Sequence, residues 1–298
     1  MGERFTLSSA VSSRRLHAIA VAATIVGGGV AFALAAQAAS DAFVYDAHAY
    51  WAADAATAYK IPEGSPDALL YAPPVVMLFD LFGAIPWPVF AYLWTFLVTA
   101  AIVFMAGPFT LPAVLFPPIA FEITLGNIHA LMGLAVIAGF RWPGTWAFIL
   151  LTKVTPGVGL LWFAFRKDWR ALAIALGVTA LIAVPTMILA PELWVAWFSA
   201  LLDAQGGKQL ASGIFAVPLL PRLVVAVALL WWGARRDATW VVPIAVTLGL
   251  PVLWDHGLAI ALASIWLARH PRYGLRRREP VGETASTALA ASAGQATA

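Results

Sequence analysis

Most side chains that could do chemistry gather in a few short polar segments of an otherwise apolar chain. The first segment is Asp46-Ala-His48-Ala-Tyr50-Trp51, in which a carboxylate and an imidazole stand among aromatic rings. Aromatic faces beside a carboxylate are typical of sugar sites, but Tyr and Trp also collect at membrane–water interfaces because their rings are amphipathic. This segment alone indicates either a sugar site or an interfacial belt of aromatic residues.

Four further polar segments follow. Each combines an aromatic, amide, imidazole, carboxylate or ammonium group with the start or the interruption of an apolar run, and they read Tyr71-Ala-Pro-Pro, Gly126-Asn127-Ile-His129, Lys153-Val-Thr-Pro156 and Trp254-Asp255-His256. We predict that Asp46, Tyr71 and His256 line one cavity near the outer membrane face. His256 has a plainer alternative as an interfacial residue capped by Asp255.

Lys153 and Arg222 are the Lys and Arg residues that lie well inside apolar runs. An ionisable group inside a membrane is costly and indicates function, which here would be the binding of a phosphate. Each cation also has a structural alternative. Lys153 could pair with Glu122 or Asp80, and Arg222 could extend outward past Pro221.

The composition shows what must position these groups. Of 298 residues, 62% are apolar and 11% are charged, and the mean hydropathy is +0.85, which excludes a soluble enzyme. The length leaves room for about eight to ten membrane helices of about 20 residues each. The chain has no cysteine, so disulfides, thiolate metal sites and cysteine nucleophiles are excluded.

The apolar runs predict the spans. They cover 18–36, 74–85, 88–106, 109–123, 127–140, 143–165, 171–190, 214–233, 239–253 and 257–268. Prolines at 112, 117, 118 and 156 break up the middle of the chain, and such breaks predict short re-entrant helices that line a cavity. Whether 109–165 makes three full crossings or two re-entrant pairs stays open.

The charges predict an orientation. Thirteen of the eighteen Lys and Arg residues fall on one side, taken as the cytoplasm, if the last four spans alternate in direction. The net charge of +3 then marks cytoplasmic loops and no nucleic-acid partner. The acidic segment 41–73, residues 191–213 and the Trp254 segment lie outside, and the turn at Pro86-Trp87-Pro88 faces the cytoplasm. We expect a cytoplasmic N-terminus over 1–17, a transmembrane domain over 18–270 with 41–73 as its outer catalytic loop, and a disordered cytoplasmic tail over 271–298.

From about Asp41 to His270 the order of these segments resembles glycosyltransferase family 87, whose members use polyprenyl-phosphate sugars. The resemblance implies an all-α polytopic membrane protein, a GT-C-like bundle with short re-entrant helices and an outer-face cavity. The family's Tyr-Pro-Pro falls on Tyr71, Pro73 and Pro74 with Ala72 inserted. Two motifs differ: the usual Gly-Gln-x-Asn reads Gly-Asn127-Ile-His129, and the usual pair of histidines after Trp reads Asp255-His256.

The resemblance also implies site residues. Asp46 matches the family's proposed base, with Asp41 as the second choice, and His256 is the other expected catalytic residue. A sugar transfer with inversion needs a base for the acceptor hydroxyl and cations for the charge on the leaving phosphate. The residues expected to bind substrate are Asp41, Tyr50, Tyr71, Asn127, His129, Lys153, Arg222, Trp254 and Asp255.

No cofactor is expected. Asp41, Asp46 and Asp255 on one face could hold Mg²⁺ or Mn²⁺, but a lipid monophosphate carries less charge than a pyrophosphate, so we expect no required metal. The chain has no Gly-rich phosphate loop, so the energy must arrive in an activated substrate in the membrane.

We expect transfer of a sugar from a polyprenyl-phosphate sugar donor to a hydroxyl of a glycolipid or glycan acceptor, with mannose as the first candidate for the sugar. The site would face outward from a bacterial-type plasma membrane. The alternative is a lipid or sugar transporter or flippase, which would need a site that both faces reach in turn. A purely structural subunit would not need Lys153 and Arg222 inside apolar runs.

Overall fold

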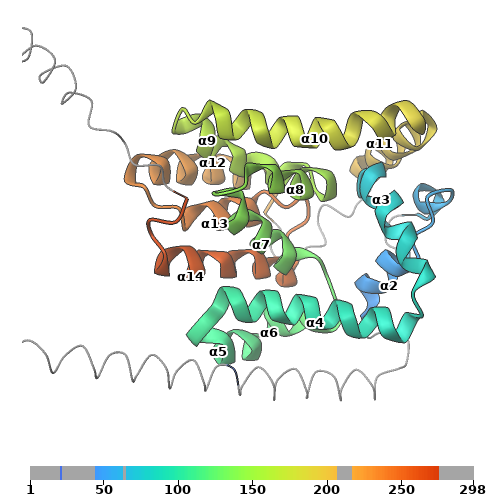
Figure 1. Cartoon of the computed structure of the whole chain (residues 1–298), viewed down its shortest axis with the longest axis horizontal. Helices are drawn as coiled ribbons and strands as arrows, with labels where there is room; N and C mark the ends of the chain where they lie inside the picture. Colours follow the sequence, from blue (N-terminus) through green and yellow to red (C-terminus); the bar gives the residue numbers. More distant parts are fainter. Residues whose placement is uncertain (1–20, 22–43, 63–64, 207–216, 275–298) are drawn as a thin grey trace, which may run out of the picture.

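The computed structural model describes Val21 and residues 44–62, 65–206 and 217–274, and within these residues every regular element is a helix (Figure 1). The predicted all-α class is therefore confirmed for the described part of the chain. Asp41, nearly all of the predicted first span, the N-terminal segment 1–17 and residues 275–298 lie outside the described residues.

Short helices form the predicted outer loop and the segment after it. They are α2 (Tyr45–Trp51), η1 (Ala58–Lys60), α3 (Pro73–Asp80) and η2 (Leu81–Ala84). Helix α3 begins at Pro73, where proline is favourable because the first helical N–H has no intrahelical partner. The preceding Ala72 N–H donates 2.9 Å to the carbonyl of Leu151, which fixes the start of α3 beside the end of another helix.

The middle of the chain is broken, as the prolines predict. The helices here are α4 (Trp87–Ala106), η3 (Gly107–Phe109), α5 (Thr110–Leu115), α6 (Pro117–Leu125) and α7 (His129–Gly139). Gly126 ends α6 in the left-handed region at φ 66°, and α7 then leaves at 102° to α6. Such a bend occurs in a broken span or in a re-entrant loop, so the re-entrant helices expected in this part of the chain stay a prediction.

A second break falls at Lys153. The helices on its two sides are η4 (Pro143–Thr145), α8 (Trp146–Thr152), η5 (Thr155–Leu160) and α9 (Leu161–Phe165). Lys153 itself is extended, with φ −145° and ψ 112°. The predicted interruption at Lys153 and Pro156 is therefore confirmed.

The last third of the described chain differs from the predicted spans. Its helices are α10 (Trp169–Leu189), α11 (Pro191–Gly206), α12 (Leu219–Arg236), α13 (Val241–Leu248), η7 (Asp255–Ala261) and α14 (Leu262–Arg269). The segment 191–213, which the sequence places on the outer side, begins with α11, and its side of the membrane stays a prediction. The run 239–253 holds only the eight-residue α13, since Gly249 and Pro251 follow at once.

The described residues contain two helical stretches long and apolar enough to cross a membrane, Trp87–Leu115 and Trp169–Leu189. The bent pair α6 and α7 makes a third if it is counted as one span. The prediction of eight to ten spans is not confirmed, because breaks at proline, glycine and polar residues shorten most of the apolar runs. Only 6% of the apolar window of α10 is buried, so this helix presents its side chains outward.

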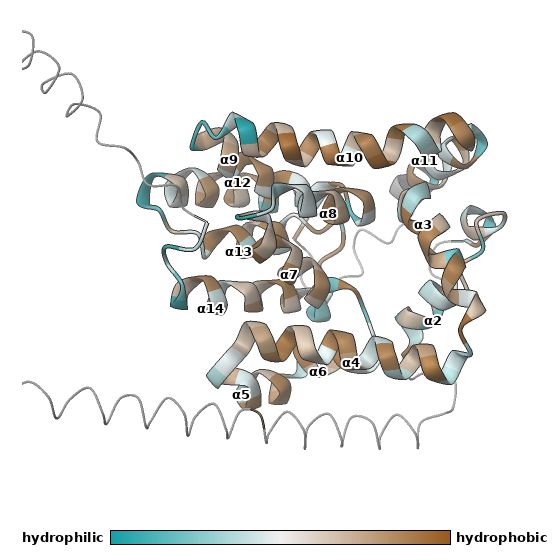
Figure 2. Ribbon diagram, in the orientation of Figure 1, coloured by the Kyte–Doolittle hydropathy of each residue, from teal (hydrophilic) through white to brown (hydrophobic). Residues whose placement is uncertain are grey.

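Hydrophilic residues mark the end of the molecule where α10 begins and α12 and α14 finish (Figure 2). The helix ends there carry Arg166, Lys167, Arg170, Arg235, Arg236 and Arg269. There Arg166 forms an ion pair with Asp237. The directions predicted for these three helices relative to the basic residues agree with this arrangement. Which side of the membrane this end faces stays a prediction.

The turn at Pro86 was predicted to lie on the opposite face from the outer loop, and this is wrong. The rings of His48 and Trp87 lie 4.8 Å apart, and Trp51 Nε1 donates 2.7 Å to the carbonyl of Ile85. The turn therefore packs on α2. The reason is length: Pro73–Ala84 rises by about 18 Å at ~1.5 Å per residue, too little for a hydrocarbon core of about 30 Å.

Helix α7 lies at the centre of the fold. It packs against α4, α8, α14 and η7, while α13 packs against α12 and η5. Its residues Met132 and Val136 are fully buried. This central position matters because α7 begins at His129, so the polar start of a buried helix lies among elements from distant parts of the chain.

Candidate active site

Asp46, Asn127 and His256 come together although α2, the bend between α6 and α7, and η7 are far apart in the chain. Asn127 Nδ2 donates 2.6 Å to Asp46 Oδ2, and the same nitrogen lies 3.5 Å from His256 Nε2. The side-chain oxygen of Asn127 accepts from the backbone N–H of Ile128 at 2.7 Å, which fixes the orientation of the amide. Asn127 therefore links the carboxylate and the imidazole that the sequence singles out.

Asp255 and Trp254 hold the other side of His256. Asp255 Oδ1 accepts from the backbone N–H of His256 at 2.8 Å and lies 3.2 Å from its Nδ1. With a proton on Nδ1, the ring leaves Nε2 as an acceptor toward Asn127. The indole of Trp254 is parallel to the imidazole within 7°, with the ring centroids 6.4 Å apart.

A second chain of contacts runs through Glu122, His129 and Lys153. His129 Nδ1 lies 3.2 Å from Glu122 Oε2, and Lys153 Nζ lies 3.0 Å from His129 Nε2. Glu122 Oε1 also accepts from the backbone N–H of Ala130 at 2.7 Å, at the start of α7. The sequence left open a direct pair between Lys153 and Glu122 or Asp80, but the nitrogen of Lys153 meets His129 instead, and Asp80 is exposed.

The two chains of contacts lie side by side. The rings of His129 and His256 are 5.2 Å apart and tilted by 47°, and both residues are buried. A carboxylate at Asp46 and an ammonium at Lys153 therefore belong to one polar cluster, which we call the Asp46–Lys153 cluster and which comprises Asp46, Glu122, Asn127, His129, Lys153, Asp255 and His256. The cluster holds both a potential base and a potential phosphate ligand.

Tyr50 and Tyr71 lie next to this cluster in the buried part of the outer segment. Their hydroxyls are 3.2 Å apart, and Tyr59 donates 2.6 Å to the backbone carbonyl of Tyr71. Burial raises the pKa of both Tyr50 and Tyr71 above its ordinary value, so both phenols keep their protons. They can donate hydrogen bonds but cannot act as bases near neutral pH.

Arg222 is not part of the cluster. Its guanidinium donates to the backbone carbonyls of Val217, Leu248, Leu250 and Pro251, at 2.8–3.0 Å. These carbonyls lie before α12 (Val217), at the last residue of α13 (Leu248) and just after α13 (Leu250 and Pro251), where carbonyls lack helical partners. The structure thus gives this buried cation a role in closing the end of α13, and we leave it out of the proposed phosphate site.

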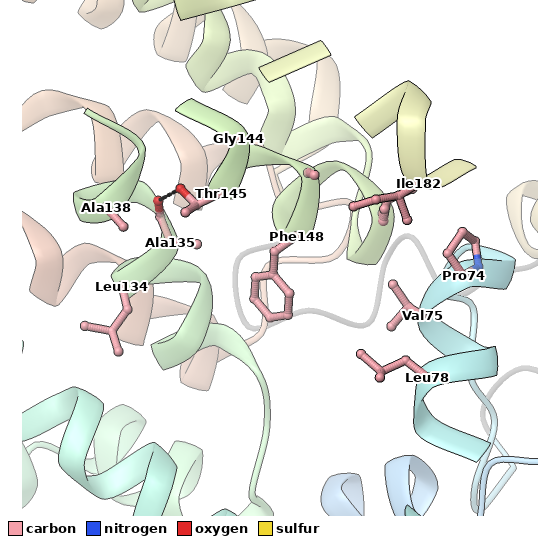
Figure 3. A pocket seen from close by; sticks show the side chains of 12 residues that line it. Pro74, Val75, Leu78, Leu134, Ala135, Ala138, Gly144, Thr145, Phe148 and Ile182 are labelled. Carbon is pink, nitrogen blue, oxygen red and sulfur yellow. Dashed lines mark hydrogen bonds between the residues drawn. The ribbon is translucent and has the colours of Figure 1, made fainter. Parts of the chain in front are cut away.

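An apolar groove of about 490 Å³ lies between α3 on one wall and α7, α8 and α10 on the other (Figure 3). Val75 and Leu78 line one wall, and Leu134, Phe148 and Ile182 line the other. At one end the lining includes Leu151, two residues before Lys153, and Pro74, three residues after Tyr71. The lining of the groove thus comes within a few residues of Lys153 and Tyr71 in the chain, although no residue of the cluster lines it. The predicted outer-face cavity itself is not confirmed.

In the described part of the chain, no three His, Asp or Glu side chains are grouped so that they could hold a metal ion. Asp41, one of the three carboxylates considered for a metal, lies outside the described residues. The independence from metal stays a prediction.

The comparison with protein families decides the class. The model for glycosyltransferase family 87 matches residues 69–293, about three quarters of the chain. The chain belongs to this family. No curated protein and no solved structure matches it. As a member of glycosyltransferase family 87 with membrane-spanning helices, it is a membrane glycosyltransferase.

The match to glycosyltransferase family 87 includes every described member of the cluster except Asp46, which lies before residue 69. The hydrogen bond from Asn127 ties Asp46 to the matched part. The sequence considered Glu122 only as a structural partner of Lys153. Glu122 could have been singled out by its position on a short helix that begins with two prolines and is followed by the bend that leads to His129.

Proposed function

We propose that this protein transfers a sugar from a polyprenyl-phosphate sugar to a hydroxyl of a glycolipid or glycan at the outer face of a bacterial-type plasma membrane. Mannose is the first candidate for this sugar. The observation that carries the proposal is the link from Asp46 through Asn127 to His256, with Lys153 held beside it by His129. A base and a cation in one buried cluster are what such a transfer requires.

In the proposed step, the acceptor hydroxyl oxygen attacks the anomeric carbon from the side opposite the phosphate, with inversion. Asp46 takes the hydroxyl proton as the new carbon–oxygen bond forms. The bond between the anomeric carbon and the phosphate oxygen breaks, and its electron pair leaves with the polyprenyl phosphate. Lys153 stabilises the charge that develops on this phosphate, and His256 positions Asn127 and hence Asp46.

The apolar groove is proposed to hold the first isoprenyl units of the donor. Its lining is almost wholly hydrophobic, and its Leu151 end lies at the backbone contact between Leu151 and Ala72, beside Tyr71 and Lys153. A lipid tail lying there would bring its phosphate to Lys153 and its sugar toward Asp46. Tyr50, Tyr71 and Trp254 would then contact the sugars.

The test is a transfer assay in membranes, with radiolabelled polyprenyl-phosphate mannose and polyprenyl-phosphate arabinose in parallel. We expect label to enter a glycolipid or glycan with one of the two donors. Movement of the intact lipid across the bilayer without transfer would favour the transporter alternative. Absence of transfer with both donors would contradict the proposed donor class.

A further inference from the structure

Glu122 is a fully buried acid that the proposed reaction does not use directly. It contacts two groups at the start of α7, the backbone N–H of Ala130 and the ring nitrogen Nδ1 of His129. A buried carboxylate is costly unless hydrogen bonds satisfy it, so its position calls for a reason beyond packing.

We propose that Glu122 is a positioning residue: it fixes the proton of His129 on Nδ1 and thereby makes Nε2 the acceptor that holds the Lys153 ammonium for the donor phosphate. The role assigned to Lys153 rests on the proposed function. The coupling from Glu122 to Lys153 through His129 rests on the contacts among the three side chains and on the charges of Glu122 and Lys153, and not on the proposed function.

The assignment of the proton follows from which groups can donate. We take Glu122 as ionised and Lys153 as protonated. A carboxylate can only accept and an ammonium can only donate, so in these states His129 donates toward Glu122 and accepts from Lys153. A neutral imidazole does this in one of its two tautomers, with the proton on Nδ1. The other tautomer would aim N–H at the ammonium and a lone pair at the carboxylate, and both contacts would repel.

The interruption of the helix at Lys153 makes the hydrogen bond to His129 necessary to hold the Lys153 side chain in place. Lys153 is extended between α8 and η5, so no regular helix fixes its side chain. Within the described part of the chain, the Lys153 nitrogen has a hydrogen-bond partner in His129 Nε2, at 3.0 Å. One N–H of the ammonium donates to the His129 ring, which leaves its other two N–H groups free to donate to phosphate oxygens.

Glu122→Gln separates this role from simple capping of α7. The amide oxygen can keep the bond from Ala130, which leaves the NH₂ group to face His129. His129 must then accept on Nδ1 and carry its proton on Nε2, which drives Lys153 away. Adding His129→Glu supplies a carboxylate that accepts from both Lys153 and the new amide NH₂ at position 122, so the double variant restores the acceptor.

The kinetic test measures initial transfer rates against donor concentration for the wild type, Glu122→Gln, the double variant and Lys153→Met, each checked for folding by thermal melting. Loss of one charge-assisted hydrogen bond predicts a donor KM about ten- to a hundredfold higher in Glu122→Gln, approaching Lys153→Met. The double variant should recover most of this loss. An unchanged KM in Glu122→Gln, or no recovery in the double variant, would overturn the proposal, because capping alone predicts both.

A second test does not depend on activity. Carbon and nitrogen NMR shifts of labelled histidine in bilayers distinguish the two tautomers, and the signal of His129 among five histidines is assigned by its loss in His129→Gln. We expect Nδ1–H in the wild type and Nε2–H in Glu122→Gln. Nε2–H in the wild type would overturn the proposal even if Glu122→Gln does not fold. A wild type with Nδ1–H but no transfer would count against the proposed function and not against this coupling.

Discussion

Asn127 Nδ2 donates a hydrogen bond of 2.6 Å to Asp46 Oδ2, although the two residues are 81 positions apart in the chain. The contact places the carboxylate from the short helix α2 against the bend between α6 and α7. It makes Asp46 part of a fixed cluster and not merely an exposed acid of an outer segment. The first two predictions follow from it.

Asp46→Asn should abolish transfer while expression and donor binding stay nearly unchanged. The amide keeps the shape of the side chain but cannot take a proton from the acceptor, and general-base catalysis contributes about 10²–10⁴-fold. The measurement is the transfer rate in membranes at saturating donor. Asp80→Asn, at an exposed acid of α3, is the matched control, and Asp41→Asn should cost far less. A dead Asp41→Asn beside an active Asp46→Asn would reassign the base.

Asn127→Leu should lower kcat by about ten- to a hundredfold with a smaller effect on the donor KM. Leucine keeps the bulk of the side chain but removes the hydrogen-bond donors that face Asp46 and His256. Hydrogen bonds to charged groups contribute about 1.5–3 kcal/mol. Steady-state kinetics in membranes measure the split. Thr124→Val, near the end of the same α6, changes a hydroxyl that bonds only locally to Phe121 and serves as the control. A change confined to KM would contradict a role in holding the base.

Lys153→Met should raise the donor concentration needed for half-maximal rate, or remove turnover, while the protein still folds. Methionine keeps the length and removes the charge. Donor titration and thermal melting of the same preparation separate the two effects. If the variant unfolds and a change at Glu122 restores folding, Lys153 is a structural residue.

Arg222→Met should lower the melting temperature strongly and leave the donor KM of the folded fraction unchanged. The substitution removes the donor from carbonyls around the end of α13, and a buried polar group without a partner costs about 1–3 kcal/mol. Arg235→Met is the control, because that guanidinium lies 4.0 Å over the ring of Trp231 on an exposed helix end. Normal melting with a raised donor KM would return Arg222 to the phosphate site.

Treatment with EDTA should leave the transfer rate unchanged. The proposed donor is a monophosphate, whose charge the Lys153 ammonium can stabilise without a divalent cation. The rate is measured before and after dialysis against the chelator. Loss of activity that Mg²⁺ or Mn²⁺ restores would show that carboxylates such as Asp46 and Asp255 serve a metal.

The sequence predicted the membership of the cluster better than the arrangement of the helices. Lys153 was singled out because a cation inside an apolar run is costly in a membrane, and Asp46, Asn127, His129 and His256 because their segments resemble those of glycosyltransferase family 87. The structure brings these five together. Hydropathy could not give the number of spans, because an apolar run does not show where its helix bends.

Arg222 and Glu122 show the limit of the reasoning from sequence. Both are buried charges, but the partners of Arg222 are backbone carbonyls up to 29 positions away, which no side-chain pattern records. The proposed role of Glu122 depends on which nitrogen of His129 carries the proton. It therefore also involves a third residue, Lys153, which donates to the other nitrogen. Their position inside apolar runs indicated that these charged residues are important, whereas their contacts in the structure determine the role of each.

The cluster draws its residues from the start, the middle and the far end of the described chain, and this has a consequence during biosynthesis. Asp46 leaves the ribosome long before Asp255 and His256, so a nascent chain that already exposes its carboxylate to lipid donors lacks the imidazole that orders it. We therefore expect transfer only after η7 and α14 have packed against α7, because this packing completes the cluster. Premature termination after residue 153 and before residue 255 yields a protein that retains Asp46 and Lys153 but cannot assemble the complete cluster.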